Sequence, residues 1–330
     1  MRICFLADSE AINTRTWVDY FADRLGHDVH VVSVNKAGEL SPSVTLHSLG
    51  TGDGTHGTSG KLALLRHAGR VRRIVARLSP DIVVGYRVAS YGFLGALTGF
   101  HPLVVAAQGQ NVVFPRRSIP KMIFARTAIR SADLLNSWAP HMTRRLTELG
   151  ADPGKILTLP RGIDTDLFRY RSEPTGDCRV ISTRTLHRMY HVDVIVRAIA
   201  LARNDVQGLS GTVVGDGNAA EELATMARDL GIEDSIAFEG RVGYERLPEL
   251  LAKSAIYASA VPTDGVSASL LEAMAVGCFP IVWDNEANRH WVEDGRNAFL
   301  IGDSDPRAYA DAIVRATAAA GLRSRAAAEN

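Results

Sequence analysis

The chain has 330 residues, of which 46% are hydrophobic and 22% charged, and its formal net charge is +1. Such values are typical of a soluble globular protein and exclude a disordered or low-complexity chain. The apolar run before Asp8 is too short for a signal peptide, and no later run reaches the length of a membrane span, so we expect a cytoplasmic protein. A chain of this length exceeds the usual size of a single core, which predicts two domains.

The first half of the chain alternates short apolar runs with longer segments of helical period. This alternation is typical of a parallel β-sheet covered by helices, and it predicts a Rossmann-like domain over residues 1–162. The expected strands begin at Arg2, His27, Asp81, Pro102 and Asp133 and read RICFLA, HDVHVVSV, DIVVGY, PLVVAA and DLLNS.

Positive charge is concentrated in this first half. Residues 1–160 contain 19 Lys and Arg against 11 Asp and Glu, whereas residues 161–330 contain 18 against 25. Within residues 61–130, the basic runs RHAGRVRRIVAR and FPRRSIPKMIFARTAIR also carry Ile, Phe and Met. Basic helices of this kind can dock on an anionic membrane, so peripheral contact with its inner face is one interpretation and an ordinary solvated helix face is the other. No nucleic-acid-binding motif accompanies the charge, which argues against a nucleic-acid partner.

A second series of strands and helices follows a turn-rich linker, which we place at residues 163–177. The runs CRVISTRT, GTVVGDG, SIAFEGR, AIYASA, FPIVWD and NAFLIGD predict a second Rossmann-like domain over residues 178–314. The expected fold class is therefore α/β, with two doubly wound domains facing a cleft and ligands beyond the carboxyl ends of the strands. Residues 315–330 are helical in composition without a stop signal, so we expect a terminal helix that is cut short.

The stretch TDGVSASLLEAMAVG, from Thr263 to Gly277, places two carboxylates eight positions apart. A strand is expected to end at Ala260 and Val261, with a loop after it and a helix from Ser269 to Val276. The amino end of such a helix favours an anion such as phosphate. Glu272 would reach a ligand there and accept hydrogen bonds from vicinal hydroxyls, each worth about 1.5–3 kcal/mol. Taken alone, the pattern is more often that of a turn Asp and a Glu that complements the helix dipole.

Three segments in order resemble a known family. Asp264, Glu272, Gly277 and Pro280 resemble the E-x7-E motif of retaining family 4 glycosyltransferases of GT-B fold, in which the loop is usually Glu-Pro-Phe-Gly. ELGADPGKILTLPRGIDTDLF resembles the Pro-x-Gly-Ile-Asp linker of that family, and VVGDGNAAEELATMARDLGIEDSIAFEGRV resembles its Gly-x-Gly strand and helix. The resemblance implies a nucleotide-sugar-binding C-terminal domain and an acceptor-side N-terminal domain.

The resemblance also implies roles for individual residues. Glu272 would hold the ribose hydroxyls of a nucleoside diphosphate sugar, and Asp264 would contact hydroxyls of the transferred sugar. Residues after the strand SIAFEG would lie near the nucleotide base, namely Arg241 and Val242. The residues that would face the sugar and the diphosphate at the helix start are Gly265, Val266, Ser267, Ala268 and Ser269.

The family places an Arg and a Lys in the loop after the first strand of the second domain, where they neutralise the leaving diphosphate. In STRTLHRMYHVD, Arg184 matches the Arg, Tyr190 stands at the Lys position, and Arg188 is a candidate for the second charge. One branch of the family combines a Tyr-Asn-Val-Asp loop with Asp-Gly-x-Ser. The chain resembles this branch, which indicates a variant site.

The first domain holds fewer candidate site residues. Gln108 stands after the strand PLVVAA where many relatives have His, and Gln108 or Gln110 could donate to a sugar hydroxyl. Asn13, Thr14 and Arg15 follow the first strand and are further candidates for the cleft.

We therefore expect a retaining glycosyltransferase that moves a sugar from a nucleoside diphosphate sugar to an acceptor hydroxyl on a glycan, a lipid-linked molecule or a small molecule. Neither a metal nor another cofactor is expected, because the helix start and the Arg side chains would neutralise the diphosphate. Two alternatives stay open: a catalytically silent protein of the same fold that binds a nucleotide sugar or assists a partner, and a nucleotide-sugar epimerase.

Overall fold

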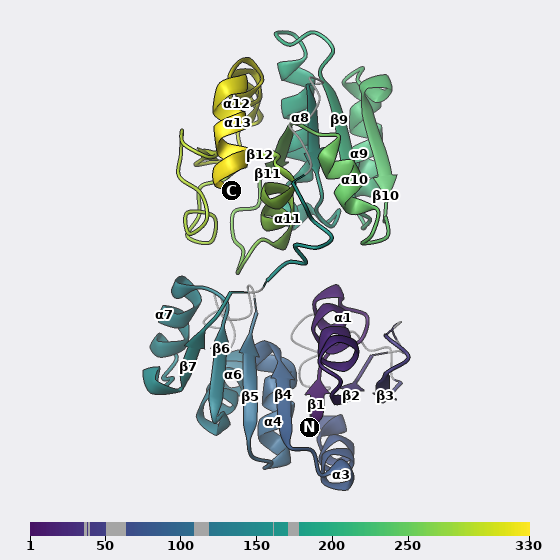
Figure 1. The fold of residues 1–330 in the computed structure, drawn as a ribbon, viewed down its shortest axis with the longest axis vertical. Helices are drawn as coiled ribbons and strands as arrows, with labels where there is room; N and C mark the ends of the chain where they lie inside the picture. The colour runs from purple at the N-terminus through teal and green to yellow at the C-terminus, as the bar shows by residue number, and fades with distance from the viewer. Residues whose placement is uncertain (36–37, 39, 51–63, 109–118, 161, 171–177) are drawn as a thin grey trace. The chain divides into compact units, whose positions relative to one another are not determined.

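The computed structural model describes residues 1–35, 38, 40–50, 64–108, 119–160, 162–170 and 178–330. They form two compact units, Met1–Pro160 (unit 1) and Arg161–Asn330 (unit 2). Each unit is a parallel sheet with helices packed against it (Figure 1). Gln110, Lys61, Arg116 and Arg117, which the sequence singled out, lie outside the described residues, as do residues 171–177 of the expected linker.

In the described part of unit 1, seven parallel strands have the order β3-β2-β1-β4-β5-β6-β7. The bounds of these strands are β1 Arg2–Leu6, β2 Asp28–Ser33, β3 Val44–Ser48, β4 Ile82–Tyr86, β5 Leu103–Ala107, β6 Leu134–Ser137 and β7 Ile156–Thr158. The helices are α1 Ile12–Asp19, α3 Ala68–Leu78, α4 Phe93–Thr98, α6 Ile119–Ser131 and α7 Pro140–Glu148, with short helical turns at η1 Tyr20–Arg24, η2 Leu64–His67, η3 Arg87–Gly92 and η5 Pro153–Lys155.

The centre of this sheet is apolar on both faces. Cys4, Phe5 and Leu6 of β1 are fully buried because helices cover both faces of a parallel sheet. On α3, Val71 and Val75 are buried while the arginines of the same helix are exposed, which is the pattern of an amphipathic surface helix. The five strands expected in this half are confirmed, whereas the edge strands β3 and β7 were not expected.

In unit 2, the described residues form six parallel strands in the order β10-β9-β8-β11-β12-β13. Their bounds are β8 Arg179–Ser182, β9 Ser210–Val214, β10 Ile236–Gly240, β11 Ile256–Ser259, β12 Phe279–Trp283 and β13 Phe299–Ile301. The helices are α8 Val192–Ala202, α9 Ala220–Asp229, α10 Leu247–Ala252, α11 Ala268–Val276, α12 Pro306–Ala318 and α13 Ala320–Glu329, with short turns at η6 Arg188–Tyr190 and η7 Glu233–Ser235. All six strands expected in this half are confirmed.

Three boundaries differ from those expected. Strand β11 ends at Ser259 rather than Val261, and the loop after it begins two residues earlier than expected. Helix α11 begins at Ala268 rather than Ser269, because the Ser267 side chain caps it. The terminal helix expected over residues 315–330 is divided at Ala319, whose backbone leaves the helical conformation between α12 and α13.

In each sheet, the strands that follow the first one along the chain are added on one side of it and then on the other. The position where the side changes is the switch point. In unit 1 this switch point lies between β1 and β4, and in unit 2 it lies between β8 and β11. Loops that leave neighbouring strands in opposite directions open a crevice at such a point, where ligands of doubly wound sheets bind. The candidate residues can therefore be located relative to the two switch points.

Candidate active site

The switch point of unit 2 brings together two segments that are far apart in the sequence. The loop after β8 carries Arg184, and the loop after β11 carries Asp264 and leads into α11. Because β8 and β11 are adjacent in the sheet, these loops start side by side. The expected cation, Arg184, and the expected acid, Asp264, therefore lie on loops at the same edge of the unit 2 sheet.

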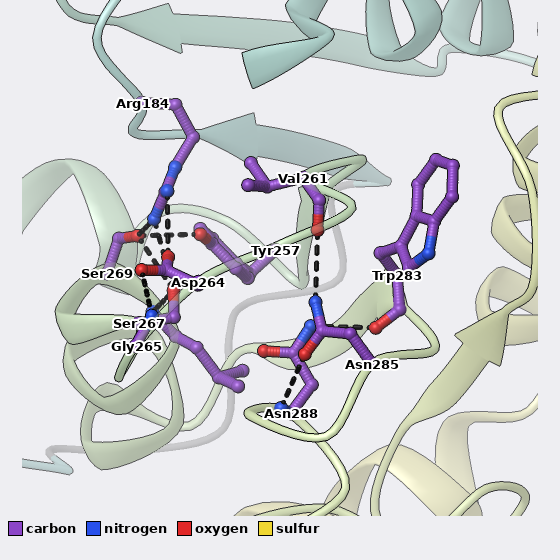
Figure 2. A network of polar contacts seen from close by, with 11 residues as sticks. Arg184, Tyr257, Val261, Asp264, Gly265, Ser267, Ser269, Trp283, Asn285 and Asn288 are labelled. Atoms are coloured by element: carbon purple, nitrogen blue, oxygen red, sulfur yellow. Dashed lines mark hydrogen bonds and ion pairs between the residues drawn. The ribbon is translucent and has the colours of Figure 1, made fainter. Parts of the chain in front are cut away.

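Arg184 and Asp264 form an ion pair with 2.9 Å between Nη2 and Oδ2 (Figure 2). Their side chains are only 11% and 21% exposed. The other terminal nitrogen of Arg184 donates to the Ser269 hydroxyl at 2.9 Å and to the Ser267 hydroxyl at 3.2 Å. The guanidinium is therefore fixed by three side chains of the β11–α11 loop and the start of α11.

The surroundings of Arg184 keep it charged. Burial disfavours a charged guanidinium, but the carboxylate of Asp264 and the hydroxyls of Tyr257 and Tyr190 outweigh this effect, so the pKa of Arg184 is raised. The ring of Tyr190 lies beneath the guanidinium, with 4.9 Å from Cζ to the ring centroid. A cation over an aromatic face gains about 0.5–2 kcal/mol, depending on how far it is removed from water.

Two glycines allow the Arg184 loop to take its position. A Cβ on Gly215 would lie 2.3 Å from the Arg184 carbonyl oxygen, and a Cβ on Gly217 would lie 2.3 Å from that of Leu186. The loop after β9 is joined to the same segment by a hydrogen bond from the Leu186 N–H to the Asp216 carbonyl. The Gly-x-Gly pattern thus permits close backbone approach behind Arg184.

The start of α11 is built from short polar residues. The Ser267 hydroxyl caps the helix by accepting from the Leu270 N–H, and the Gly265 N–H donates to Asp264. Buried Tyr257 on β11 donates to the Ser269 hydroxyl at 2.8 Å. The first N–H groups of an α-helix have no partner within the helix and carry its positive dipole end, so this structure suits an anion.

Glu272 lies one turn further along α11 and is only 5% exposed. Its Oε1 accepts a hydrogen bond from the Tyr244 hydroxyl at 3.2 Å. The ring of Tyr244 packs edge-on against Phe168, and Val242 packs in the same apolar cluster. Arg241, the other residue expected near a base, is exposed.

A second loop supports the segment that carries Asp264. The Asn285 side-chain amide donates to the Val261 carbonyl at 3.1 Å, and Asn288 donates to the Trp283 carbonyl at 2.7 Å. Figure 2 shows the bond from Asn285 to Val261, which braces the loop that carries Asp264, and the bond from Asn288 to Trp283 at the end of β12. Sequence reasoning missed Tyr244, Tyr257, Asn285 and Asn288. No short motif marks them: Tyr244, Tyr257 and Asn285 act on residues 28, 12 and 24 positions away, and Asn288 acts on the Trp283 backbone.

Arg188 does not join the Arg184 network. Its side chain is 83% exposed and bonds to Glu222 on α9 at 2.9 Å. In unit 1, Gln108 is buried after β5, and Asn13 lies in the first turn of α1, where its carbonyl accepts from the Tyr86 hydroxyl at 3.1 Å. Among the described residues, no group of three or more His, Cys, Asp or Glu side chains is arranged to hold a metal ion.

Known protein families and solved structures resemble this chain. Residues 165–329 match the model of glycosyl transferases group 1, and residues 2–137 match that of the glycosyl transferase 4-like proteins. D-inositol 3-phosphate glycosyltransferase of Acidothermus cellulolyticus is 27% identical over 242 residues, 65% of this chain and 53% of that protein. The chain thus spans about half the length of this relative.

A GDP-mannose-dependent alpha-(1-6)-phosphatidylinositol monomannoside mannosyltransferase of Mycolicibacterium smegmatis is 24% identical over 272 residues, 74% of this chain and 69% of that one. Among solved structures, Anabaena HepE in complex with UDP and glucose has a TM-score of 0.78 at 19% identity, covering 100% of this chain and 94% of that chain. Sucrose-phosphate synthase from Thermosynechococcus elongatus has a TM-score of 0.82 at 15% identity, covering 99% and 92%. These structural matches confirm the expected GT-B fold.

Proposed function

This chain belongs to the glycosyl transferases group 1, whose family model matches half of it, and from this premise we propose that it is a retaining glycosyltransferase. Its donor is a nucleoside diphosphate sugar and its acceptor carries a hydroxyl group. The observation that carries the proposal is the Arg184 network at the start of α11, with Glu272 one turn beyond it. The solved HepE structure that this chain resembles contains UDP and glucose.

Arg184 and the start of α11 bind the donor diphosphate. The bonds of Arg184 to Asp264, Ser267 and Ser269 use three of the five N–H groups of a guanidinium, which leaves two for phosphate oxygens. Because Asp264 already balances the charge of Arg184, the backbone N–H groups of residues 266–269 must supply much of the remaining attraction. Preorganised donors of this kind are what stabilise charge that develops on a leaving group.

Glu272 binds the ribose of the donor. Its carboxylate accepts from Tyr244 on one oxygen, and this bond fixes the orientation of the group. An ionised carboxylate offers about four lone-pair sites, so it can accept from vicinal hydroxyls as well as from a tyrosine. Arg241 and Val242 follow β10 and border the base.

Asp264 contacts the sugar that is transferred. Both of its oxygens already accept one bond, from Arg184 and from the Gly265 N–H, so the carboxylate is held in one orientation. An ionised carboxylate has further lone pairs for a sugar hydroxyl. The ion pair thus couples the residue on the diphosphate to the residue on the sugar.

The reaction breaks the bond between the anomeric carbon and the diphosphate, whose oxygen keeps the electron pair. The acceptor oxygen forms the new bond on the same face of the oxocarbenium-like sugar, and its proton passes to the departing phosphate oxygen. Arg184 and the N–H groups at the start of α11 stabilise the charge on that phosphate. No protein base takes part, and the neutralisation requires neither a divalent cation nor another cofactor.

A nucleotide-release screen tests this proposal. The protein is incubated with UDP-, GDP-, ADP- and TDP-sugars and a panel of hydroxyl acceptors, with and without EDTA. We expect release of one nucleoside diphosphate that persists in EDTA, and a product with the anomeric configuration of the donor. Conversion of the sugar without nucleotide release would indicate an epimerase, and binding without either reaction would indicate a silent protein.

We further propose that unit 1 contacts an anionic membrane through a basic surface on η2, α3 and α6. Arg66, Arg70, Arg72, Arg73 and Arg77 are exposed on the first two elements. On α6, Ile119 and Ile123 are 71% and 54% exposed, and α4 packs against both α3 and α6. None of the helices in the described ranges is long and apolar enough to cross a bilayer.

Arginines close to an anionic surface contribute about 1 kcal/mol each, and the isoleucines would insert between lipids. Vesicle co-sedimentation tests this contact. Binding should require anionic lipid and weaken in the double variant Arg72→Gln/Arg73→Gln, whereas equal binding of both proteins would contradict it.

A further inference from the structure

The switch point of unit 1 carries two arginines. Arg87 directly follows β4, and Arg15 lies in the first turn of α1, which follows β1. The two segments are joined, because the Tyr86 hydroxyl donates to the Asn13 carbonyl at 3.1 Å and the Tyr86 ring packs against Trp17 at 5.8 Å. Arg15 and Arg87 therefore flank one fixed contact at the carboxyl edge of the sheet.

Four buried polar atoms lie at this same edge without a hydrogen-bond partner among the described residues. They are Thr14 Oγ1, Arg15 Nε, Asn35 Oδ1 and Gln108 Nε2. These residues follow β1, β2 and β5, and Thr14, Asn35 and Gln108 are 1%, 6% and 5% exposed. Each buried polar atom without a partner costs about 1–3 kcal/mol, so their collection at a ligand edge indicates a site built for a polar ligand.

The charge at this edge indicates the chemistry of the ligand. Within the described part of unit 1, the guanidinium groups of Arg15 and Arg87 form no ion pair, in contrast to that of Arg184. Asp8 lies nearby at the end of β1, but its Oδ1 accepts from the Glu10 N–H and it pairs with neither arginine. Glu10 itself is exposed.

The backbone of Arg87 adds a second observation. Its φ is +70°, a left-handed conformation that is uncommon for a residue other than glycine. Such strain costs about 1–3 kcal/mol and persists mainly where it positions a group for function. A glycine would adopt this conformation without strain, so the presence of Arg points to a use for its side chain.

We infer that the carboxyl edge of the unit 1 sheet binds an oxyanion on the acceptor, a phosphate or carboxylate group, through Arg15 and Arg87. Planar guanidinium groups bind both kinds of oxyanion with paired hydrogen bonds. Gln108, Thr14 and Asn35 hold the hydroxyls of the same acceptor molecule. This inference rests on the proposed sugar transfer, since it names the class of acceptor, but the binding it describes can be measured without turnover.

Titration calorimetry on the full chain tests the inference with four probes: glucose, glucose 6-phosphate, glucuronate and inorganic phosphate. The variants are Arg15→Gln, Arg87→Gln and Arg184→Gln, together with Arg24→Gln as a control. Arg24 is exposed on η1 and has the same charge, so its loss measures the general effect of net charge. A fifth variant, Arg15→Lys, keeps the charge but not the paired geometry, and thermal unfolding checks that each protein is folded.

Wild-type protein should bind glucose 6-phosphate or glucuronate at least tenfold more tightly than glucose, and the comparison of the two identifies the oxyanion. Arg15→Gln and Arg87→Gln should each lose at least tenfold, Arg15→Lys should lose less, and Arg24→Gln should bind as the wild type does. Equal affinity for charged and neutral probes would overturn the inference. A loss confined to Arg184→Gln would also overturn it, because the anion would then sit in unit 2. Failure of the proposed transfer would instead appear as absence of nucleotide release with anion binding intact.

Discussion

The two switch points of the molecule carry arginines in opposite states. In unit 2, Arg184 bonds to Asp264, Ser267 and Ser269 and lies over Tyr190. In unit 1, Arg15 and Arg87 have no ion-pair partner among the described residues, and buried polar atoms around them are unsatisfied. A site whose own residues satisfy one another is preorganised for charge that develops during a reaction, whereas a site with unsatisfied polar atoms depends on a ligand to complete it.

Removal of Arg184, which is hydrogen-bonded within unit 2, should have the largest effect on activity. Arg184→Gln should lower nucleotide release by about 100-fold or more, comparable to the loss of one preorganised donor to a developing anion. The same change leaves Asp264 without its partner, which costs about 3 kcal/mol for a largely buried pair. Nucleotide-release kinetics and chemical denaturation measure the two effects.

The double variant Arg184→Gln/Asp264→Asn is the matched control. It should recover most of the lost stability but not the lost turnover. If the double variant were both stable and active, Arg184 would be a structural residue only.

The next largest effect should come from Glu272. Glu272→Gln should weaken nucleoside diphosphate binding by about 10- to 150-fold, the equivalent of one charged hydrogen bond of 1.5–3 kcal/mol. The 2′-deoxy nucleotide provides a control: the wild type should bind it more weakly than the ribonucleotide, and the variant should not distinguish the two. If the variant still bound the ribonucleotide more tightly than the 2′-deoxy nucleotide, Glu272 would not contact the ribose.

Asp264→Asn should impair the contact with the transferred sugar without weakening the binding of the diphosphate. Turnover should fall about tenfold, because a neutral amide bonds to a sugar hydroxyl more weakly than a carboxylate does. Nucleoside diphosphate affinity should stay equal or rise, since Arg184 would keep its charge without a balancing acid. A large loss of free-nucleotide affinity, measured by calorimetry, would contradict the assignment of Asp264 to the sugar.

The smallest effect should come from the aromatic residue beneath Arg184. Tyr190→Leu should reduce turnover by about 2- to 10-fold, in line with the loss of a cation–π contact. Tyr190→Phe keeps the ring and should retain most of the activity. Equal losses in the two variants would show that the hydroxyl, not the ring, is the important group.

The sequence predicted most of the fold because buried parallel strands are continuous apolar runs. The edge strands β3 and β7 escaped prediction because they lack such runs: VTLHS and ILT are mostly half-buried or exposed. The predicted bounds of α11 differ from the observed ones by one residue at most. Ser267 is a strong capping residue, and Gly277 ends the helix in a left-handed conformation.

The candidate site was predictable only in part. The family resemblance pointed to Arg184, Asp264 and Glu272, but the ion pair joins residues 80 positions apart, and no local pattern encodes it. Tyr244 and Tyr257 could not be recognised as partners of Glu272 and Ser269 for the same reason. Arg188, the candidate for the second charge, bonds instead to Glu222 on α9.

The central claim is that the start of α11, with Arg184, binds the diphosphate of the donor. Titration calorimetry of UDP, GDP, ADP and TDP against wild-type, Arg184→Gln and Arg24→Gln proteins tests it most directly. We predict that at least one nucleoside diphosphate binds the wild type and Arg24→Gln equally, and binds Arg184→Gln at least tenfold more weakly. Binding of equal strength to Arg184→Gln, or no binding of any nucleoside diphosphate to the wild type, would contradict the claim.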